Sequence, residues 1–219
     1  MVKVGEFVDD AIKANTRSNW NTWFSNEKYL KEYATPERLS SYKETIKLCE
    51  NEGANFQNGN IIDVGCGTGH LLRELKKSHP NIDIFGTDFS EESILVSKQV
   101  NEDSRNDHFF VMDIYNIPNE QFYKYDYVIC SEVLEHLLHP EEALKNIAQL
   151  TNENGVLIIT VPNGRVDSYG EHINFWSPES WQVFIENNLD KTTFTHKFKL
   201  FNNNRNIFVL VSKNEQSNK

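Results

Sequence analysis

Three glycines at alternate positions follow an aspartate in the stretch Asp63-Val64-Gly65-Cys66-Gly67-Thr68-Gly69. Glycine is needed where the backbone adopts a positive φ or passes close to a ligand. An apolar pair precedes the stretch and the amphipathic run 71–77 follows it, so the order is strand, tight turn and helix start. Free N–H groups at a helix N-terminus attract anionic groups. The stretch therefore predicts a loop that binds a nucleotide-type cofactor.

A second carboxylate supports this prediction. Residues 82–88 have the character of a strand and end at Asp88, 25 positions after Asp63. An acidic residue at the end of the second strand can accept hydrogen bonds from both ribose hydroxyls of a nucleotide. The NAD fingerprint G-x-G-x-x-G would place its third glycine at position 70, where this chain has His70. The loop therefore departs from the dinucleotide pattern.

The stretch 63–69 resembles motif I of the class I S-adenosylmethionine-dependent methyltransferases. Asp88 matches that family's acidic residue, residues 111–114 match its adenine-contacting stretch, and residues 126–137 match its fourth strand and the following loop. The resemblance extends from about 61 to 163 and includes the E-V-L-E-H sequence typical of one subgroup. It implies S-adenosylmethionine as cofactor, bound by Asp63, Gly65, Cys66, Gly67, Thr68, Gly69, Asp88, Phe89, Met112, Asp113, Ile114 and Ser131.

The candidate catalytic residues are His136, Glu135 and His172. Methyl transfer from a sulfonium is an in-line displacement, so the enzyme aligns the acceptor and supplies a base only for a hydroxyl or a protonated amine. His136 follows the strand at 127–130 and should lie at the sheet edge where ligands bind. Its residue type makes it the best base, so the rate of methyl transfer should rise with pH through the imidazole pKa, which is about 6.5 when unperturbed. The alternative is that His136 only caps or packs the next helix.

Glu132, Glu135 and His136 also form an E-x-x-E-H pattern, and His172 follows the next strand. This set resembles the two glutamates and two histidines that bind Mg²⁺ in small-RNA 3′-terminal 2′-O-methyltransferases. Many methyltransferases of sugars, quinones and other small metabolites resemble the chain in the same two places without a metal. The helix dipole alone also favours glutamates at a helix start. We therefore predict no metal, and activity that survives chelation.

From residue 61 onward, strand and helix patterns alternate, which implies right-handed crossovers and a parallel sheet. A hairpin through Asn202-Asn203-Asn204 should close the chain with strands at about 192–201 and 206–212. The resulting prediction is an α/β, Rossmann-like class I methyltransferase fold. Its seven-stranded sheet would be mostly parallel with an antiparallel last strand, helices on both faces and an N-terminal helical cap. Asn154-Gly155 should form the turn into the strand at 156–161.

The domain prediction has three parts. Residues 1–55 form a helical cap or lid within the same domain, rich in aromatics but without a clear period up to about residue 34. Thr35-Pro36-Glu37 should start a helix, with threonine as N-cap and proline in the first turn, and Ser90 and Ser177 should cap two further helices. Residues 56–213 form the cofactor-binding core, and residues 214–219 form a disordered tail.

Composition indicates a globular protein in the cytoplasm. The net charge is −10, which disfavours nucleic acid and anionic membranes as partners. The chain has no signal-peptide core and no apolar run of membrane-spanning length, and its three cysteines show no C-x-x-C spacing. Free thiols in a reducing compartment fit this pattern.

These observations predict an enzyme of small-molecule biosynthesis that methylates a small or sugar-like acceptor. Oxygen is the favoured target atom, and nitrogen is the second choice. One alternative is a metal-dependent RNA 3′-terminal 2′-O-methyltransferase. Another is a catalytically inactive subunit that binds S-adenosylmethionine for a partner. The sequence specifies neither the acceptor nor the oligomeric state.

Overall fold

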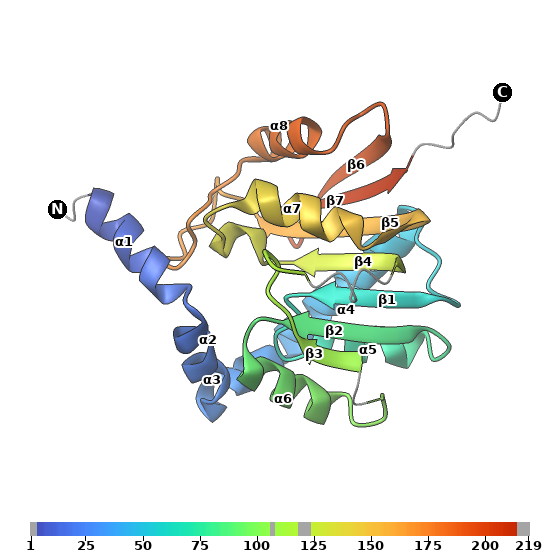
Figure 1. Cartoon of the computed structure of the whole chain (residues 1–219), viewed down its shortest axis with the longest axis horizontal. Coiled ribbons are helices and arrows are strands. Elements are labelled where there is room, and N and C mark those ends of the chain that lie inside the picture. The colour runs from blue at the N-terminus through green and yellow to red at the C-terminus, as the bar shows by residue number, and fades with distance from the viewer. Residues whose placement is uncertain (1–3, 106–107, 118–123, 214–219) are drawn as a thin grey trace.

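The computed structural model of the chain describes residues 4–105, 108–117 and 124–213. One seven-stranded sheet, ordered β3-β2-β1-β4-β5-β7-β6, forms its centre (Figure 1). β7 pairs antiparallel with β5 and β6, while the pairs among the first five strands are parallel. The strands are β1 (Asn60–Val64), β2 (Asp83–Asp88), β3 (Phe109–Val111), β4 (Tyr125–Ser131), β5 (Thr151–Pro162), β6 (Phe194–Phe201) and β7 (Asn206–Lys213). The predicted fold class is confirmed.

Helices cover both faces of the sheet, and several begin at the caps expected from the sequence. The side chains of Thr35, Ser90 and Ser177 each accept a hydrogen bond from a backbone N–H of the first helical turn. The helices are α1 (Val4–Ala14), α2 (Arg17–Phe24), α3 (Glu27–Tyr33), α4 (Pro36–Asn51), α5 (His70–Ser78), α6 (Glu91–Val100), the 3₁₀ helix η3 (Leu134–His136), α7 (Pro140–Gln149) and α8 (Pro178–Asn188).

Two apolar cores lie on opposite faces of the sheet, because successive residues of a strand point to opposite sides. Ile61 faces the core formed with α4, α5 and α6, whereas Ile62 faces the core formed with α7 and α8. β1 is central and buried on both sides, so it reads as a continuous apolar run interrupted by Asp63. The buried carboxyl group of Asp63 near the carboxyl end of the strand therefore indicates a functional role for this position.

The N-terminal helices lie along one edge of the sheet. Figure 1 shows α1, α2 and α3 in a row at the edge toward which the arrows of β1, β2 and β4 point. This edge is the carboxyl end of the parallel strands, where α/β folds bind their ligands. The aromatic residues of this segment are interleaved with polar ones, so it shows no clear helical period. Its rings pack on one another between α2 and α3, where Trp23 meets Tyr29 and Phe24 meets Tyr33.

One local expectation is wrong. Asn154-Gly155 does not form a turn before the strand, because β5 already begins at Thr151 and includes both residues. The pairing of β4 with β5 shifts register between Tyr125 and Tyr127. A Cβ at Gly155 would lie 2.9 Å from the Tyr125 carbonyl oxygen, so glycine here permits a close backbone approach within an irregular ladder.

Two further expectations concern the C-terminal tail and membrane-spanning segments. The tail 214–219 lies outside the described residues. Within the described ranges, no helix combines the length and apolar character needed to cross a bilayer.

Candidate active site

The glycine loop between β1 and α5 has the backbone conformation that its sequence predicts. Gly65, Gly67 and Gly69 have φ values of 80°, 51° and 73°, all in the region that side chains disfavour. The N–H groups of Gly65 and Cys66 donate to the carbonyl oxygen of Thr87 at 2.7 and 2.9 Å. The loop is thereby fixed to the end of β2, with the N-terminus of α5 directly behind it.

Asp88 joins this loop to the second strand. One carboxylate oxygen accepts from the N–H of Gly67 at 3.0 Å and the other accepts from the N–H of Ser90 at 3.0 Å. Burial raises the pKa of Asp88, and these backbone hydrogen bonds oppose the rise. The sequence predicted only a ribose acceptor, whereas the structure shows that Asp88 also holds the loop in shape.

Asp63 lies deeper in the same corner. It is buried, and within the described part of the chain its Oδ1 has no hydrogen-bond partner. Burial first, and then the nearby charge of Asp88, raises its pKa to about 7. An unsatisfied buried carboxylate is costly, which favours a site for a ligand with donor groups.

The other predicted loop residues contribute backbone rather than side chains. Cys66 is buried in the α4–α6 core and its thiol pKa is raised by burial. Thr68 is also buried, and its hydroxyl lies 2.8 Å from Nδ1 of His70. Neither side chain is available to a cofactor in this arrangement. The N–H groups of all three glycines already donate to groups of the protein, so the loop offers a cofactor backbone without side chains.

Residues of the predicted adenine side lie at the carboxyl ends of β2 and β3. The N–H of Met112 donates to the carbonyl of Asp88 at 2.9 Å, which brings the two strand ends together. Met112 and Ile114 are buried against the α7–α8 core, and Asp113 Oδ1 accepts from the N–H of Tyr115 at 3.0 Å. Phe89 lies beneath the guanidinium of Arg17, whose carbon is 5.9 Å from the ring centroid.

The end of β4 carries Ser131 and Glu132. The Ser131 hydroxyl lies 2.7 Å from that of Thr160, and Glu132 has an unusual φ of 57°. This conformation directs the Glu132 carboxylate toward β5 and β7, where Thr160 and Asn206 donate to it at 2.9 and 2.8 Å. Burial raises the pKa of Glu132 to about 7 in spite of these hydrogen bonds.

Glu135, His136 and His172 come together beside this carboxylate. Nε2 of each histidine lies 4.0 Å from Oε1 of Glu135, and the two rings meet edge to face at 4.7 Å between centroids. Donor atoms of all three residues lie within 4.8 Å of one another. The predicted catalytic residues are therefore close neighbours, whereas Glu132, the fourth member of the considered metal set, is directed at Thr160 and Asn206 instead.

Electrostatics distinguish the members of this cluster. Both carboxylate oxygens of Glu135 are buried and lack a hydrogen-bond partner among the described residues. Burial, and then the charge of Glu132, raises the pKa of Glu135 well above its usual range. Burial, and then His172, lowers the pKa of His136 to about 4. The expected imidazole titration near pH 6.5 is therefore wrong for His136, which is a weak base in this environment.

Aromatic residues of α2 cover the cofactor loop and the histidines. A Cβ placed on Gly67 would lie 3.7 Å from the Phe24 ring. Trp20 stacks on Phe24 with ring centroids 5.8 Å apart and meets His136 edge to face at 5.3 Å. The N-terminal helices thus form a cap over the glycine loop.

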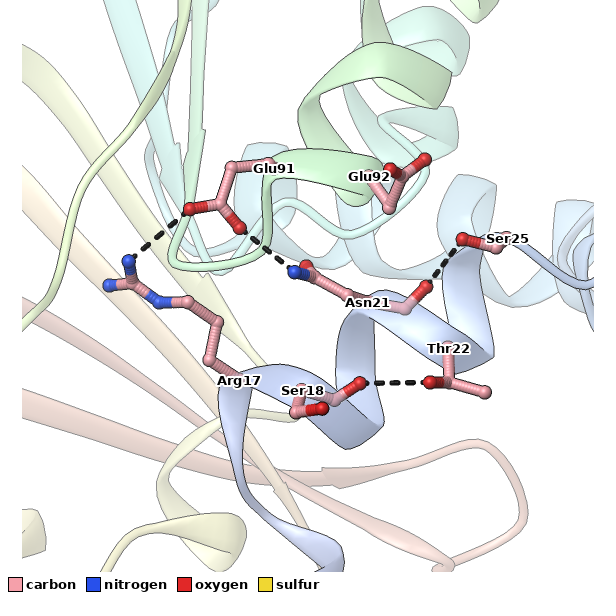
Figure 2. A pocket seen from close by; sticks show the side chains of 7 residues that line it. All are labelled: Arg17, Ser18, Asn21, Thr22, Ser25, Glu91 and Glu92. Carbon is pink, nitrogen blue, oxygen red and sulfur yellow. Dashed lines mark hydrogen bonds and ion pairs between the residues drawn. The ribbon is translucent and has the colours of Figure 1, made fainter.

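Polar contacts hold this cap on α6. Figure 2 shows Asn21 and Arg17 of α2 reaching Glu91 of α6 across a groove of about 590 Å³. Asn21 Nδ2 donates to Glu91 at 2.9 Å, Arg17 pairs with Glu91 at 3.3 Å, and the Ser90 hydroxyl donates to Asn21 Oδ1 at 2.6 Å. Ser90 is two residues after Asp88, so the cap contacts the same corner that holds the predicted ribose acceptor.

Comparison with known proteins identifies the class of this site. Residues 35–202 match the family described as "Methyltransferase domain". The chain belongs to this family of S-adenosylmethionine-dependent methyltransferases. The predicted enzyme class and cofactor are thereby confirmed.

Curated relatives of this methyltransferase match only part of their own length. A "Ubiquinone biosynthesis O-methyltransferase" of Coxiella burnetii (strain RSA 493 / Nine Mile phase I) is 34% identical over 135 residues, which cover 61% of this chain and 53% of the relative. Another protein with that name, from Rickettsia typhi, is 29% identical over 150 residues, which cover 65% of this chain and 58% of the relative. The chain thus spans little more than half the length of these relatives.

Solved structures share the fold. One chain of the complex between the Haloferax volcanii Trm112 methyltransferase activator and a methyltransferase superposes with a TM-score of 0.69 at 14% identity. The match covers 88% of this chain and 96% of that chain. The plantazolicin methyltransferase BpumL gives 0.67 at 18% identity, over 96% and 99%. The second likeness covers 96% of this chain, so it includes most of the N-terminal helices as well as the sheet.

Sequence reasoning missed several residues of the methyltransferase site. Asp167 contacts His172, and Asn21 holds the cap. Arg38 of α4 exerts its charge on both Tyr33 and Glu132. Asn21 and Arg38 belong to segments far from the motifs in sequence, whereas Asp167 lies five residues before His172. Only the aromatic density of 20–33 offered a signal.

Proposed function

We propose that this methyltransferase transfers the methyl group of S-adenosylmethionine to a hydroxyl oxygen of a small-molecule acceptor. The observation that carries the proposal is the histidine pair at the carboxyl end of β4, beside the edge where the glycine loop would present the methyl group. A hydroxyl must lose its proton during transfer, and a neutral imidazole can accept it. The names of the curated relatives support oxygen as the methylated atom.

The geometry supports the following cofactor roles. Asp88 would accept the ribose hydroxyls, the glycine backbone would allow close approach, and Phe89, Met112 and Ile114 would border the adenine. Arg38 would be available for the carboxylate of the methionine part, because its charge reaches the same corner. The N-terminal cap would close over the bound cofactor and exclude water.

The acceptor side favours a partly apolar molecule. Large hydrophobic side chains are exposed just after η3, at Leu138, and on the 163–176 segment, at Val166, Tyr169 and Phe175. The rings of Tyr169 and Phe175 lie 4.9 and 6.1 Å from the His172 ring. Apolar surface beside a polar catalytic cluster suits an aromatic or alkyl-bearing hydroxyl compound better than a bare sugar.

The test is methyl transfer from labelled S-adenosylmethionine to separate pools of phenols, sugars, aliphatic alcohols, amines and RNA 3′ ends. We expect labelled O-methyl product from the phenol or alcohol pool. Product only from amines, or only from RNA ends, would contradict the proposal. Tight cofactor binding without product from any pool would favour the alternative of an inactive partner subunit.

Asp88→Asn tests the cofactor roles separately. The amide keeps the size of the carboxylate, but only its oxygen can accept a hydrogen bond, because the other oxygen is replaced by an NH₂ donor. We therefore expect the Kd for S-adenosylhomocysteine to rise about ten- to hundred-fold in calorimetry. Asp83→Asn is the matched control, since Asp83 is exposed at the opposite end of the same strand. Equal affinities in the two variants would remove Asp88 from the binding site.

A metal-assisted form of the same reaction is the second candidate. The specific observation in its favour is Glu135, which lies between two histidines and whose buried carboxylate has no hydrogen-bond partner in the described part of the chain. In this form, Glu135, His136 and His172 would hold a divalent ion, which would act as a Lewis acid on the acceptor hydroxyl. A protonated Glu135 explains the same burial without an ion, in agreement with its raised pKa.

Chelation separates these two forms. We expect turnover to survive dialysis against EDTA, because the sulfonium already carries an activated methyl group. Loss of turnover that Mg²⁺ or Mn²⁺ restores would establish the metal-assisted form.

A further inference from the structure

Asp167 and His172 form a close buried contact that the reaction described above does not use. Oδ2 of Asp167 lies 2.6 Å from Nδ1 of His172, and the two side chains are only 11% and 10% exposed. The other oxygen of Asp167 accepts from the N–H of Tyr169 at 3.1 Å. The carboxylate is therefore held from both sides in one orientation.

This contact determines which nitrogen of His172 carries hydrogen. A carboxylate can only accept hydrogen bonds, so Nδ1 must be the donor. In a neutral ring the hydrogen on Nδ1 leaves Nε2 with its lone pair exposed. Nε2 is the atom that lies toward Glu135 and the His136 ring, at the centre of the catalytic cluster.

The backbone around His172 is fixed to η3. The N–H groups of Ile173 and Asn174 donate to the carbonyl of Glu135 at 2.8 and 3.0 Å. The Asn174 side chain donates to the carbonyls of Leu134 and Leu137 at 3.2 and 2.7 Å. The 163–176 segment thus brings His172 to a defined place, and Asp167 fixes the ring within that place.

His136 has no comparable support. Its Nδ1 is buried without a hydrogen-bond partner among the described residues, and its ring is hydrogen-bonded to the backbone of Glu171 rather than to a carboxylate. Its pKa is lowered to about 4, first by burial and then by His172. The two histidines were equivalent as residue types, and the carboxylate contact distinguishes them.

We infer that Asp167 is a positioning residue that fixes His172 in the Nδ1–H tautomer, so that Nε2 of His172 presents its lone pair to the acceptor hydroxyl. The inference deepens the proposed function and rests on it for the last step. The tautomer itself is needed in both forms of the reaction, since an imidazole that accepts a proton and one that binds a metal both require a bare nitrogen.

The experiment is long-range ¹H–¹⁵N correlation NMR of the full chain with ¹⁵N-labelled histidine, at pH 8 in EDTA. The spectrum of His172→Gln assigns the His172 signals. We expect a protonated Nδ1 and an unprotonated Nε2 in the wild type. In Asp167→Asn, whose amide can donate to Nδ1, the proton should move to Nε2. Asp190→Asn is the matched control, because Asp190 also accepts a backbone N–H two residues on, from Thr192 at 3.0 Å.

The activity arm uses catechol as probe acceptor. Asp167→Asn should lower kcat by about ten- to hundred-fold, as expected for loss of a group that orients a functional histidine, with the Kd for S-adenosylhomocysteine unchanged. A wild-type ring protonated on Nε2 alone or on both nitrogens would overturn the inference, as would a spectrum unaffected by Asp167→Asn. A correct tautomer with no hydroxyl methylation in any acceptor pool would instead contradict the proposed function.

Discussion

At the residue scale, Gly67 combines a positive φ with a place directly beneath the cap. Its φ is 51°, and a Cβ would lie between the loop and the Phe24 ring of the cap. Gly67→Val should therefore abolish binding of S-adenosylhomocysteine in calorimetry, because a branched side chain is strained there and fills the space where the cofactor meets the backbone.

The control for this loop variant is Gly170→Val. A Cβ at Gly170 has no neighbour within 4 Å, so binding and folding should remain unchanged. Circular dichroism would verify that Gly67→Val is folded. Normal binding by a folded Gly67→Val protein would show that the loop does not contact the cofactor.

His136 gives a prediction about acid stability. Its folded-state pKa of about 4 lies below the ordinary 6.5, so folding favours the neutral ring. This contribution is complete above about pH 6.5 and is lost as the pH falls toward 4. Between pH 7.5 and pH 5 the wild type should lose about 2 kcal/mol of unfolding free energy from this group.

Urea unfolding at the two pH values measures this loss. His136→Gln should show a correspondingly smaller difference between pH 7.5 and pH 5 than the wild type. His139→Gln should retain the wild-type difference, because the His139 side chain is 65% exposed. Identical differences in all three proteins would mean that the His136 ring is not shielded from protonation.

At the scale of elements, the contact between α2 and α6 controls the cap. Asn21 makes two hydrogen bonds to the start of α6, whereas Thr22 bonds only to Ser18 within α2 (Figure 2). Asn21→Ala should speed amide hydrogen exchange across Arg17–Phe24 and raise the dissociation rate of S-adenosylhomocysteine about two- to tenfold, since each lost hydrogen bond is worth about 1 kcal/mol.

Thr22→Ala provides the comparison within the same helix. It removes a hydroxyl without touching α6, so exchange in α2 and cofactor dissociation should stay near wild type. Equal dissociation rates for the wild type and Asn21→Ala would show that the cap does not retain the cofactor, and the segment would then be a packing element only.

At the scale of the whole molecule, stability depends on the two cores that sandwich the sheet. Trp181 of α8 is fully buried in the α7–α8 core, where its ring lies 4.9 Å from that of Trp176 and 5.4 Å from that of Phe184. Trp181→Ala should lower the unfolding free energy by about 3–5 kcal/mol in urea denaturation, because lost contacts and a cavity add together.

Val183→Ala tests whether the effect belongs to burial rather than to the helix. Val183 is 54% exposed on α8, so its truncation should change stability by at most about 0.5 kcal/mol. Similar losses in the two variants would indicate that α8 is not packed on the sheet as described.

The sequence by itself determined the order of the elements from about residue 35 onward and the conformation of the glycine loop. Glycine spacing, apolar strands and helix caps act within a few residues, so local chemistry specified β1, the loop, α5 and the N-caps at Thr35, Ser90 and Ser177. Asp88 was also recognisable, because its position at a strand end depends only on that strand.

Only the tertiary structure decided how the site works. The positive φ of Glu132 turned its carboxylate toward Thr160 and Asn206, and burial weakened His136 as a base. The 163–176 segment brought His172 onto η3 with Asp167 behind it. Burial and hydrogen bonding between distant segments set the protonation and direction of a side chain, and these quantities have no local signature in a sequence.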